Sequence, residues 1–260
     1  MKCHFNKLNS IVLFIGFYAF SITTLNAQSN RFNYNSFIQH KDTLPYRILT
    51  PDYDTSRSFP LVIFLHGSGE RGRDNEAQLK WGVMNFSSDQ MMLSHPSFVL
   101  APQCPEQQSW ANFYNSKDSF NYVLKTNASR PMELLINLIH QLCKSNRIDT
   151  NRIYITGVSM GGFGTFDAIT RYPHLFAAAV PVCGAGDTSK ASTISSIPIW
   201  IYHGAEDPAV SPLHAYNMNA ALVKAGANPG LTVYPSIGHF SWLGAYIDPL
   251  MINWLYQQHK

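Results

Sequence analysis

The sequence predicts an α/β protein built on one doubly wound, mostly parallel sheet with helices on both faces. Short apolar and β-branched runs alternate with segments of helical periodicity, as expected when each parallel strand is followed by a crossover helix. These runs are almost continuously apolar, which is typical of strands buried on both faces. The 260 residues contain no repeats or low-complexity linkers, so we expect one domain with a large core.

Residues 1–27 have the features of a secretory signal peptide. Lys2 and Lys7 give a positive start, an apolar stretch follows, and Ala27 is the small residue expected before a cleavage site. The alternative is an uncleaved membrane anchor, although the apolar core of residues 11–20 is short for a span. We expect residues 28–260 to form a single secreted or periplasmic domain, without stable membrane insertion after cleavage.

Charge and cysteine content narrow the class of protein further. Removal of residues 1–27 takes away two lysines and no acid, which lowers the net charge from +3 to +1. This gives no reason to expect nucleic acid or an anionic membrane as partner. Cys143 lies in a helical pattern and is expected to be buried, whereas Cys104 and Cys183 follow predicted strands, and whether they form a disulfide stays open. No Cys/His spacing resembles a zinc site, and we expect neither metal nor cofactor.

The expected elements follow one another with short connections. Segments 32–40 and 43–49 alternate in polarity and predict an antiparallel edge hairpin, and 59–67 and 98–102 predict buried strands. Residues 103–130 are polar with several aromatics and predict a long surface loop. A helix capped by Ser129 precedes the strand at 152–158 and a helix ending near Tyr172. Strands at 175–183 and 197–203, a helix at 212–225 ended by Gly226, a strand at 231–234 and a helix started by Asp248 and Pro249 complete the chain.

One strand breaks into a glycine-flanked serine. Residues 152–158 run into Gly157-Val158-Ser159-Met160-Gly161 and then into a helical pattern. Glycines on both sides let a strand and a helix pass close together around a sharp turn, which exposes the serine hydroxyl. The five-residue pattern alone is weakly specific, but its strand-turn-helix context predicts that Ser159 is a nucleophile.

Two partners for this serine follow later predicted strands. Asp207 comes after the strand at 197–203, and His239 comes after the strand at 231–234. Parallel sheets place ligands beyond the carboxyl ends of their strands, so the three side chains are expected to meet. Serine needs a base to become nucleophilic, imidazole supplies it near neutral pH, and a carboxylate orients and stabilises the imidazole. Serine, acid and histidine occur here in the chain order of the α/β-hydrolase triad.

Other titratable residues nearby have simpler explanations. Glu206 is the competing acid, but it lies one residue closer to the strand than Asp207. His66 and His203 are expected to hold loops by hydrogen bonding, and Asp248 is explained as a helix cap. Attack on a carbonyl also needs two backbone N–H donors for the oxyanion. We expect them from Met160 and from Ser68, in the glycine-rich loop after the strand at 59–67.

Several motifs together resemble a known family. They are His66-Gly67-Ser68-Gly69-Glu70-Arg71-Gly72, the run 101–105 with Trp110, the serine motif, the run 181–184, His203-Gly204 with Asp207, and Gly238-His239 with Trp242. Across residues 43–257 the chain is similar to secreted bacterial esterases of the α/β-hydrolase superfamily, the group labelled predicted peptidases or phospholipase/carboxylesterase-like. It also resembles the feruloyl and acetyl-xylan esterases of carbohydrate esterase family 1. The resemblance implies Ser159 as nucleophile, Asp207 as acid and His239 as base.

The length of the segment between the strands predicted at 175–183 and 197–203 limits the kind of substrate site that the chain can form. Only residues 184–196 lie between the strand after the nucleophile helix and the acid's strand, too few for a cap domain. An open site favours esters on large molecules, so we expect a secreted serine esterase acting on acyl groups of plant polysaccharides or on phenolic esters. A serine peptidase with the same triad, or a non-catalytic binding protein of this fold, is the alternative. Three aromatic residues are candidates to line the mouth and stack on sugar or aromatic acyl groups, with simple packing as the alternative: Trp110, Tyr114 and Trp242. Glu70, Arg71 and Gln103 are expected to brace the loops rather than to contact substrate.

Overall fold

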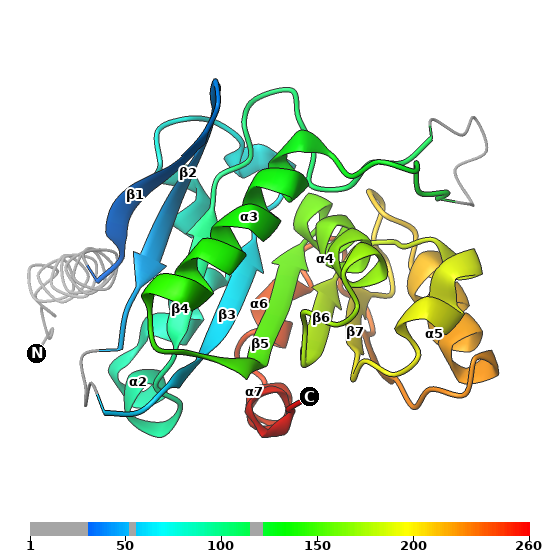
Figure 1. Ribbon diagram of the computed structural model, residues 1–260. Coiled ribbons are helices and arrows are strands. Elements are labelled where there is room, and N and C mark those ends of the chain that lie inside the picture. The colour runs from blue at the N-terminus through cyan, green and yellow to red at the C-terminus, as the bar shows by residue number, and fades with distance from the viewer. Residues whose placement is uncertain (1–30, 52–55, 115–121) are drawn as a thin grey trace, which may run out of the picture.

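The computed structural model of the protein describes residues 31–51, 56–114 and 122–260 (Figure 1). The expected leader at 1–27 lies outside these residues. The strands are β1 (Asn33–Gln39), β2 (Asp42–Leu49), β3 (Phe59–Leu65), β4 (Phe98–Pro102), β5 (Ile148–Val158), β6 (Ala178–Val182), β7 (Trp200–Gly204) and β8 (Gly230–Tyr234). The α-helices are α2 (Asp89–Ser94), α3 (Arg130–Ser145), α4 (Met160–Arg171), α5 (Leu213–Lys224), α6 (Trp242–Ala245) and α7 (Pro249–Gln257). Short 3₁₀ segments are η1 (Ser68–Glu70), η2 (Ala77–Leu79), η3 (Val83–Ser87) and η4 (Thr188–Ile194).

The strands form one mostly parallel sheet in the order β1-β2-β4-β3-β5-β6-β7-β8. β1 and β2 pair antiparallel as the hairpin was expected to, and β2 joins β4 antiparallel. Every pairing from β4 to β8 is parallel, so β3, β5, β6, β7 and β8 end at the same edge. The expected doubly wound sheet is confirmed, and β8 is an edge strand whose residues are all only partly buried.

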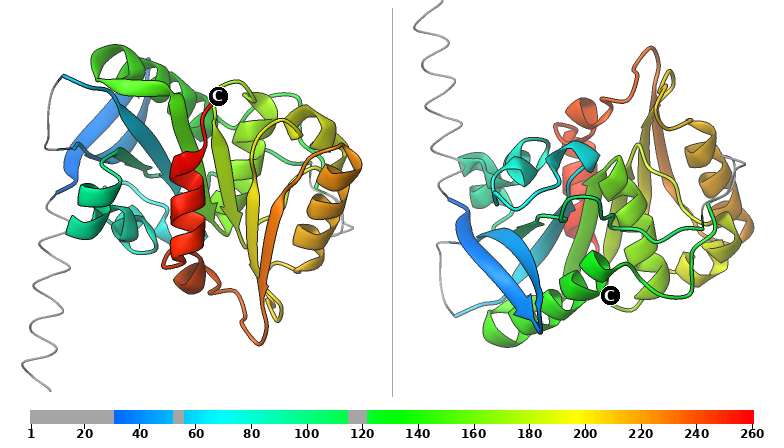
Figure 2. Two further views of the ribbon diagram at one scale, coloured as in Figure 1. Left: turned by 90° about the horizontal axis from the view of Figure 1, so that it is seen from below. Right: turned by 90° about the horizontal axis from the view of Figure 1, so that it is seen from above.

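Two apolar clusters hold helices to opposite faces of the sheet. Alternate side chains of β3 explain the division, because Leu61, Ile63 and Leu65 join the cluster that contains α3, α4 and α5. Val62 and Phe64 join the other cluster, with η3 and α7. Figure 2 shows α7 on the opposite side of the sheet from α3. Such two-sided burial is the reason that the β3 sequence is continuously apolar.

Local sequence signals account for most helix boundaries. Ser129 caps α3 by accepting a hydrogen bond from the Met132 N–H, and Asp248 caps α7 in the same way from Leu250. Gly226 follows α5 with φ +87°, a conformation that favours glycine. β6 begins three residues later than expected, because Leu175 still belongs to a turn in which its N–H bonds the Tyr172 carbonyl.

Two further features concern access and membranes. The β6–β7 connection, residues 183–199, is slightly longer than expected and contains η4 but no helical cap. Among the described residues, no helix has the length and apolar character needed to span a bilayer.

Candidate active site

Ser159 occupies the turn between β5 and α4 in a strained conformation. Its φ is 53° and its ψ is −117°, outside the regions that L-residues usually adopt. The Ser159 N–H bonds the Val182 carbonyl of β6 at 3.0 Å, and its carbonyl accepts the Phe163 N–H at 3.0 Å. The turn is therefore fixed between the central strand and its helix, with the hydroxyl at the carboxyl edge of the sheet.

The two flanking glycines are required by close approach of backbones. A Cβ at Gly161 would lie 1.9 Å from the carbonyl oxygen of Leu65, and one at Gly157 would lie 2.5 Å from the carbonyl oxygen of Gly161. No side chain fits either gap. The glycines thus allow α4 to start directly against β3, as the sequence pattern predicted.

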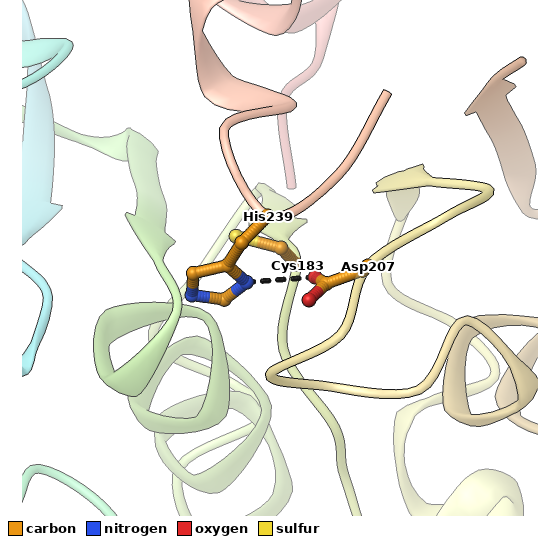
Figure 3. A group of neighbouring side chains, drawn as sticks. All are labelled: Cys183, Asp207 and His239. Atoms are coloured by element: carbon orange, nitrogen blue, oxygen red, sulfur yellow. Dashed lines mark hydrogen bonds and ion pairs between the residues drawn. The ribbon is translucent and has the colours of Figure 1, made fainter. Parts of the chain in front are cut away.

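The structure brings Ser159, Asp207 and His239 together. The Nδ1 atom of His239 lies 2.7 Å from Oδ2 of Asp207, the hydrogen bond drawn in Figure 3. The other ring nitrogen, Nε2, lies 2.8 Å from the Ser159 hydroxyl oxygen. An ionised Asp207 can only accept, so Nδ1 carries the proton and Nε2 is the acceptor for the serine hydroxyl. This is the arrangement needed for proton transfer from serine to histidine.

Asp207 is held ionised by its surroundings. Burial disfavours its charge, but hydrogen bonds from His203, from His239 and from the backbone N–H groups of Val210 and Ala209 outweigh burial and keep its pKa well below its usual range. Oδ1 accepts the two backbone bonds, each 2.9 Å long. Oδ2 is left for the imidazoles, so the carboxylate has a fixed orientation.

His203 supports the same carboxylate. Its Nε2 lies 2.9 Å from the Val210 carbonyl and 3.3 Å from Oδ2 of Asp207. Because a carbonyl only accepts, Nε2 carries the proton and donates to both. The competing acid, Glu206, has an exposed side chain and anchors its backbone N–H on the Ile237 carbonyl. The structure therefore favours Asp207 over Glu206 as the partner of His239.

Cys183 is a third group beside this pair. Its sulfur, an Asp207 oxygen and a His239 nitrogen lie within 4.8 Å of one another (Figure 3). Burial raises the pKa of the Cys183 thiol to about 12, so it stays protonated near neutral pH. A metal would need the thiolate and a free imidazole nitrogen, yet both nitrogens of His239 are engaged by Asp207 and Ser159. The cluster thus fits a serine site better than a metal site.

His66 braces the loop after β3, as expected. It is 1% exposed, its Nδ1 donates to the Gly67 carbonyl at 2.6 Å, and its Nε2 accepts the Cys104 N–H at 2.9 Å. Burial lowers the His66 pKa to about 4. Both Cys104 and Cys183 are free thiols, which resolves the open question of a disulfide between them.

The glycine-rich loop is braced by the polar residues that the sequence singled out. Nε of Arg71 donates to the Ser68 carbonyl at 2.9 Å, and Gln103 donates to the Glu70 carbonyl at 3.1 Å. The buried Glu70 carboxylate accepts the Gly67 N–H and the Trp81 indole N–H, while burial raises its pKa. A Cβ at Gly67 would lie 3.7 Å from Cβ of Ser159, so this loop adjoins the nucleophile turn.

Of the three aromatic residues expected at the mouth of the site, two are buried and one is exposed. The prediction for Trp110 is wrong, because it is 0% exposed and donates its indole N–H to the His66 carbonyl at 3.2 Å. The prediction for Trp242 as a mouth-lining residue is also wrong, because it is 6% exposed and packs against the His239 ring with the two ring centroids 5.5 Å apart. Tyr114 is 55% exposed, with Lys125 over its ring, and its place at the mouth stays a prediction.

Two residues near the site, Trp81 and Phe240, were given no functional role from the sequence. Phe240 is 54% exposed and directly follows His239, so its place next to the base could have been predicted from the sequence. Trp81 lies far away in the sequence, and its ring reaches within 6.0 Å of the Phe240 ring only in the folded chain.

Comparisons with known proteins agree with this geometry. The family model described as Phospholipase/Carboxylesterase matches residues 53–245. Poly(3-hydroxyalkanoate) depolymerase C of Paucimonas lemoignei is 30% identical over 48% of this chain, and a bifunctional acetylxylan esterase/xylanase of Neocallimastix patriciarum is 24% identical over 57%. The crystal structure of a thermostable esterase superposes with a TM-score of 0.84 at 37% identity over 90% of this chain.

These relatives are longer proteins. The matches span 28% and 19% of the two curated relatives and 64% of the thermostable esterase. The chain therefore spans about two thirds or less of the length of each of these relatives.

Proposed function

The chain belongs to the phospholipase/carboxylesterase family of α/β-hydrolases, and on that premise we propose that it is a serine esterase that works through an acyl-enzyme. The observation that carries the proposal is the continuous hydrogen-bonded series from Asp207 through His239 to Ser159, with bonds of 2.7 and 2.8 Å. A binding protein of this fold would have no use for all three groups in register.

The proposed reaction has two halves. The Ser159 oxygen bonds to the ester carbonyl carbon as its proton moves to Nε2 of His239, and Asp207 stabilises the resulting imidazolium. The tetrahedral intermediate then breaks its bond to the alcohol oxygen, which takes the proton from Nε2. Water next attacks the acyl-enzyme by the same route, releasing the acid and restoring Ser159.

Two backbone donors are proposed for the oxyanion. Met160 is the first residue of α4, where N–H groups have no partner within the helix and the helix dipole favours negative charge. Ser68 begins η1 in the loop that adjoins Ser159. Donors of this kind in a fixed frame contribute about 3 kcal/mol each to transition-state stabilisation.

The proposed substrates are acyl esters on plant polysaccharides or phenolic esters, met outside the cytoplasm after removal of the leader. Support comes from the short β6–β7 connection, which leaves room for a large substrate, and from the acetylxylan esterase relative. A serine peptidase with the same triad would need His239 to protonate an amine, and matched amides test that alternative.

The test compares the wild type with Ser159→Ala and Cys183→Ser on aryl acetates, feruloyl methyl ester, acetylated xylan and matched amides. We expect ester hydrolysis by the wild type and by Cys183→Ser, and a loss of about 10⁵-fold or more in kcat for Ser159→Ala. Undiminished turnover by Ser159→Ala would refute the mechanism. Faster cleavage of the amides than of the esters would favour the peptidase.

A further inference from the structure

A cluster of three aromatic rings, of which one is exposed, lies beside the base. We call Trp81, Phe240 and Trp242 the aromatic rim. The Trp242 ring is 5.5 Å from the His239 ring, the Phe240 ring is 4.7 Å from that of Trp242, and the Trp81 ring is 6.0 Å from both. Trp242 is buried, Trp81 is partly exposed, and Phe240 is 54% exposed, so the rim has a buried base and an open surface.

The rim is anchored to the nucleophile side of the site as well. The Trp81 indole N–H bonds the Glu70 carboxylate, whose Oε2 atom lies 3.1 Å from where a Cβ of Gly67 would be. Lys80 lies over the Trp81 ring at 5.1 Å, so the larger free ring face belongs to Phe240. The rim therefore spans from the glycine-rich loop to the base.

Further exposed apolar side chains occur close to Phe240 in the sequence. Ile237 is 41% exposed and Leu243 is 56% exposed, and both flank Phe240 in the sequence. Continuous exposed apolar surface is uncommon on soluble domains and marks sites of interaction. Its position next to the catalytic candidates makes a part of the substrate the occupant to consider first.

The order of steps in the reaction identifies which part of the substrate would lie there. The leaving alcohol oxygen must come within about 3 Å of Nε2 of His239 to receive its proton. The acyl group, in contrast, stays on Ser159 after the alcohol has gone. The rim begins in ring contact with His239, the residue that must protonate the leaving oxygen, so the alcohol is the part of the substrate that we assign to it.

We propose that the aromatic rim binds the alcohol part of the ester, and that it selects alcohols whose ring offers a flat apolar face. Phenols and benzylic alcohols have such a face, and so do sugar rings on their C–H side. The proposal rests on the proposed esterase function and adds a leaving-group preference to it. Phe240 and Trp81 are the specificity-determining residues.

The experiment holds the acyl group constant and varies the alcohol. It measures kcat/KM for ethyl acetate, benzyl acetate and an acetylated methyl xyloside, using the wild type, Phe240→Ala, Phe240→Tyr, Trp81→Ala and Val223→Ala. Val223 is the matched control, because it is 57% exposed and lies on α5 outside the rim. A second series holds ethanol constant and varies the acyl group from acetyl to butanoyl.

Stacking on one aromatic ring corresponds to about a two- to tenfold rate preference. We expect the ratio of benzyl to ethyl turnover to fall by that factor in Phe240→Ala and Trp81→Ala, and to persist in Phe240→Tyr and Val223→Ala. A parallel fall for the xyloside assigns sugar rings to the same surface, and a fall for benzyl acetate alone restricts it to aromatic alcohols.

Other outcomes overturn the inference. An unchanged benzyl-to-ethyl ratio in both alanine variants refutes the rim as an alcohol site, while ester turnover and its dependence on Ser159 would leave the proposed function standing. A larger change in the acyl series than in the alcohol series assigns the rim to the acyl group and likewise refutes the inference. Absence of any ester turnover by the wild type refutes both proposals.

Discussion

Acidification should destabilise the fold through one buried imidazole, His66. Its folded-state pKa is about 4, against 6.5 for the free side chain, because burial opposes the charged form. The structure adds a geometric reason, since Nε2 accepts the Cys104 N–H and cannot take a proton without losing that bond. Above about pH 7.5 both the folded and the unfolded chain hold His66 neutral, so it adds no pH dependence there.

The sign and size of the effect follow from these two values. As the pH falls below 6.5, the unfolded chain binds a proton that the folded chain excludes, and stability drops until the pH reaches about 4. Each pH unit between them is worth about 1.4 kcal/mol for one proton, so the full loss is about 3 kcal/mol. His66 is almost fully buried, so solvent screening does not reduce this figure.

Urea denaturation between pH 7.5 and 4.5 tests this. The variant His66→Gln removes the titrating group, and His140→Gln is the control because His140 is exposed on α3. We expect the variant to be less stable than the wild type at pH 7.5, and the difference in unfolding free energy to narrow by about 2.5 kcal/mol by pH 4.5. Parallel loss of stability in the wild type and His66→Gln over this range would refute the reasoning.

Three further outcomes are expected. Gly161→Ala should abolish soluble folded protein, because its Cβ would lie 1.9 Å from a backbone oxygen, whereas Gly69→Ala, with no atom within 4 Å of its Cβ, should keep the wild-type Tm; equal Tm values would contradict the packing argument. Glu70→Ala should lower kcat more than it raises KM, since the carboxylate holds the loop of an expected oxyanion donor, and Glu70→Gln should rescue kcat; a change in KM alone would contradict this role. Cys104 and Cys183 should resist alkylation at pH 8 in the folded chain, because their pKa values are about 12, and peptide mapping that finds either one labelled as fast as in urea would contradict their burial.

The fold and the three central side chains were predictable because their signals are local. Ser159 stands in a strand-turn-helix pattern, and Asp207 and His239 each follow a strand by a few residues. Once the strands are parallel, their ends meet at one edge, and the three side chains converge there. The order of the three residues in the chain and their positions at strand ends were sufficient to predict that they meet.

The surroundings of the site were not predictable in the same way, because they depend on contacts between distant segments. The 81–87 segment reaches the α6 region through a hydrogen bond of 2.8 Å from Asn85 to the Tyr246 carbonyl, across 161 residues. Trp110 looked like a surface aromatic in a polar loop. Its Cβ instead lies 2.4 Å from where a Cβ of Gly164 would be, so a glycine on α4 opens the space that buries it.

Because β8 lies at the edge of the sheet, we expect activity to be lost at a lower temperature than the fold. Ser159 follows β5, which is paired on both sides, whereas His239 follows a strand that is paired only with β7 and is partly buried throughout. Edge segments with few buried contacts open at a lower free energy than the core, so local opening would withdraw the base while the nucleophile turn stays intact. On heating, we expect ester turnover to fail below the global unfolding transition, with hydrogen exchange at β8 rising first.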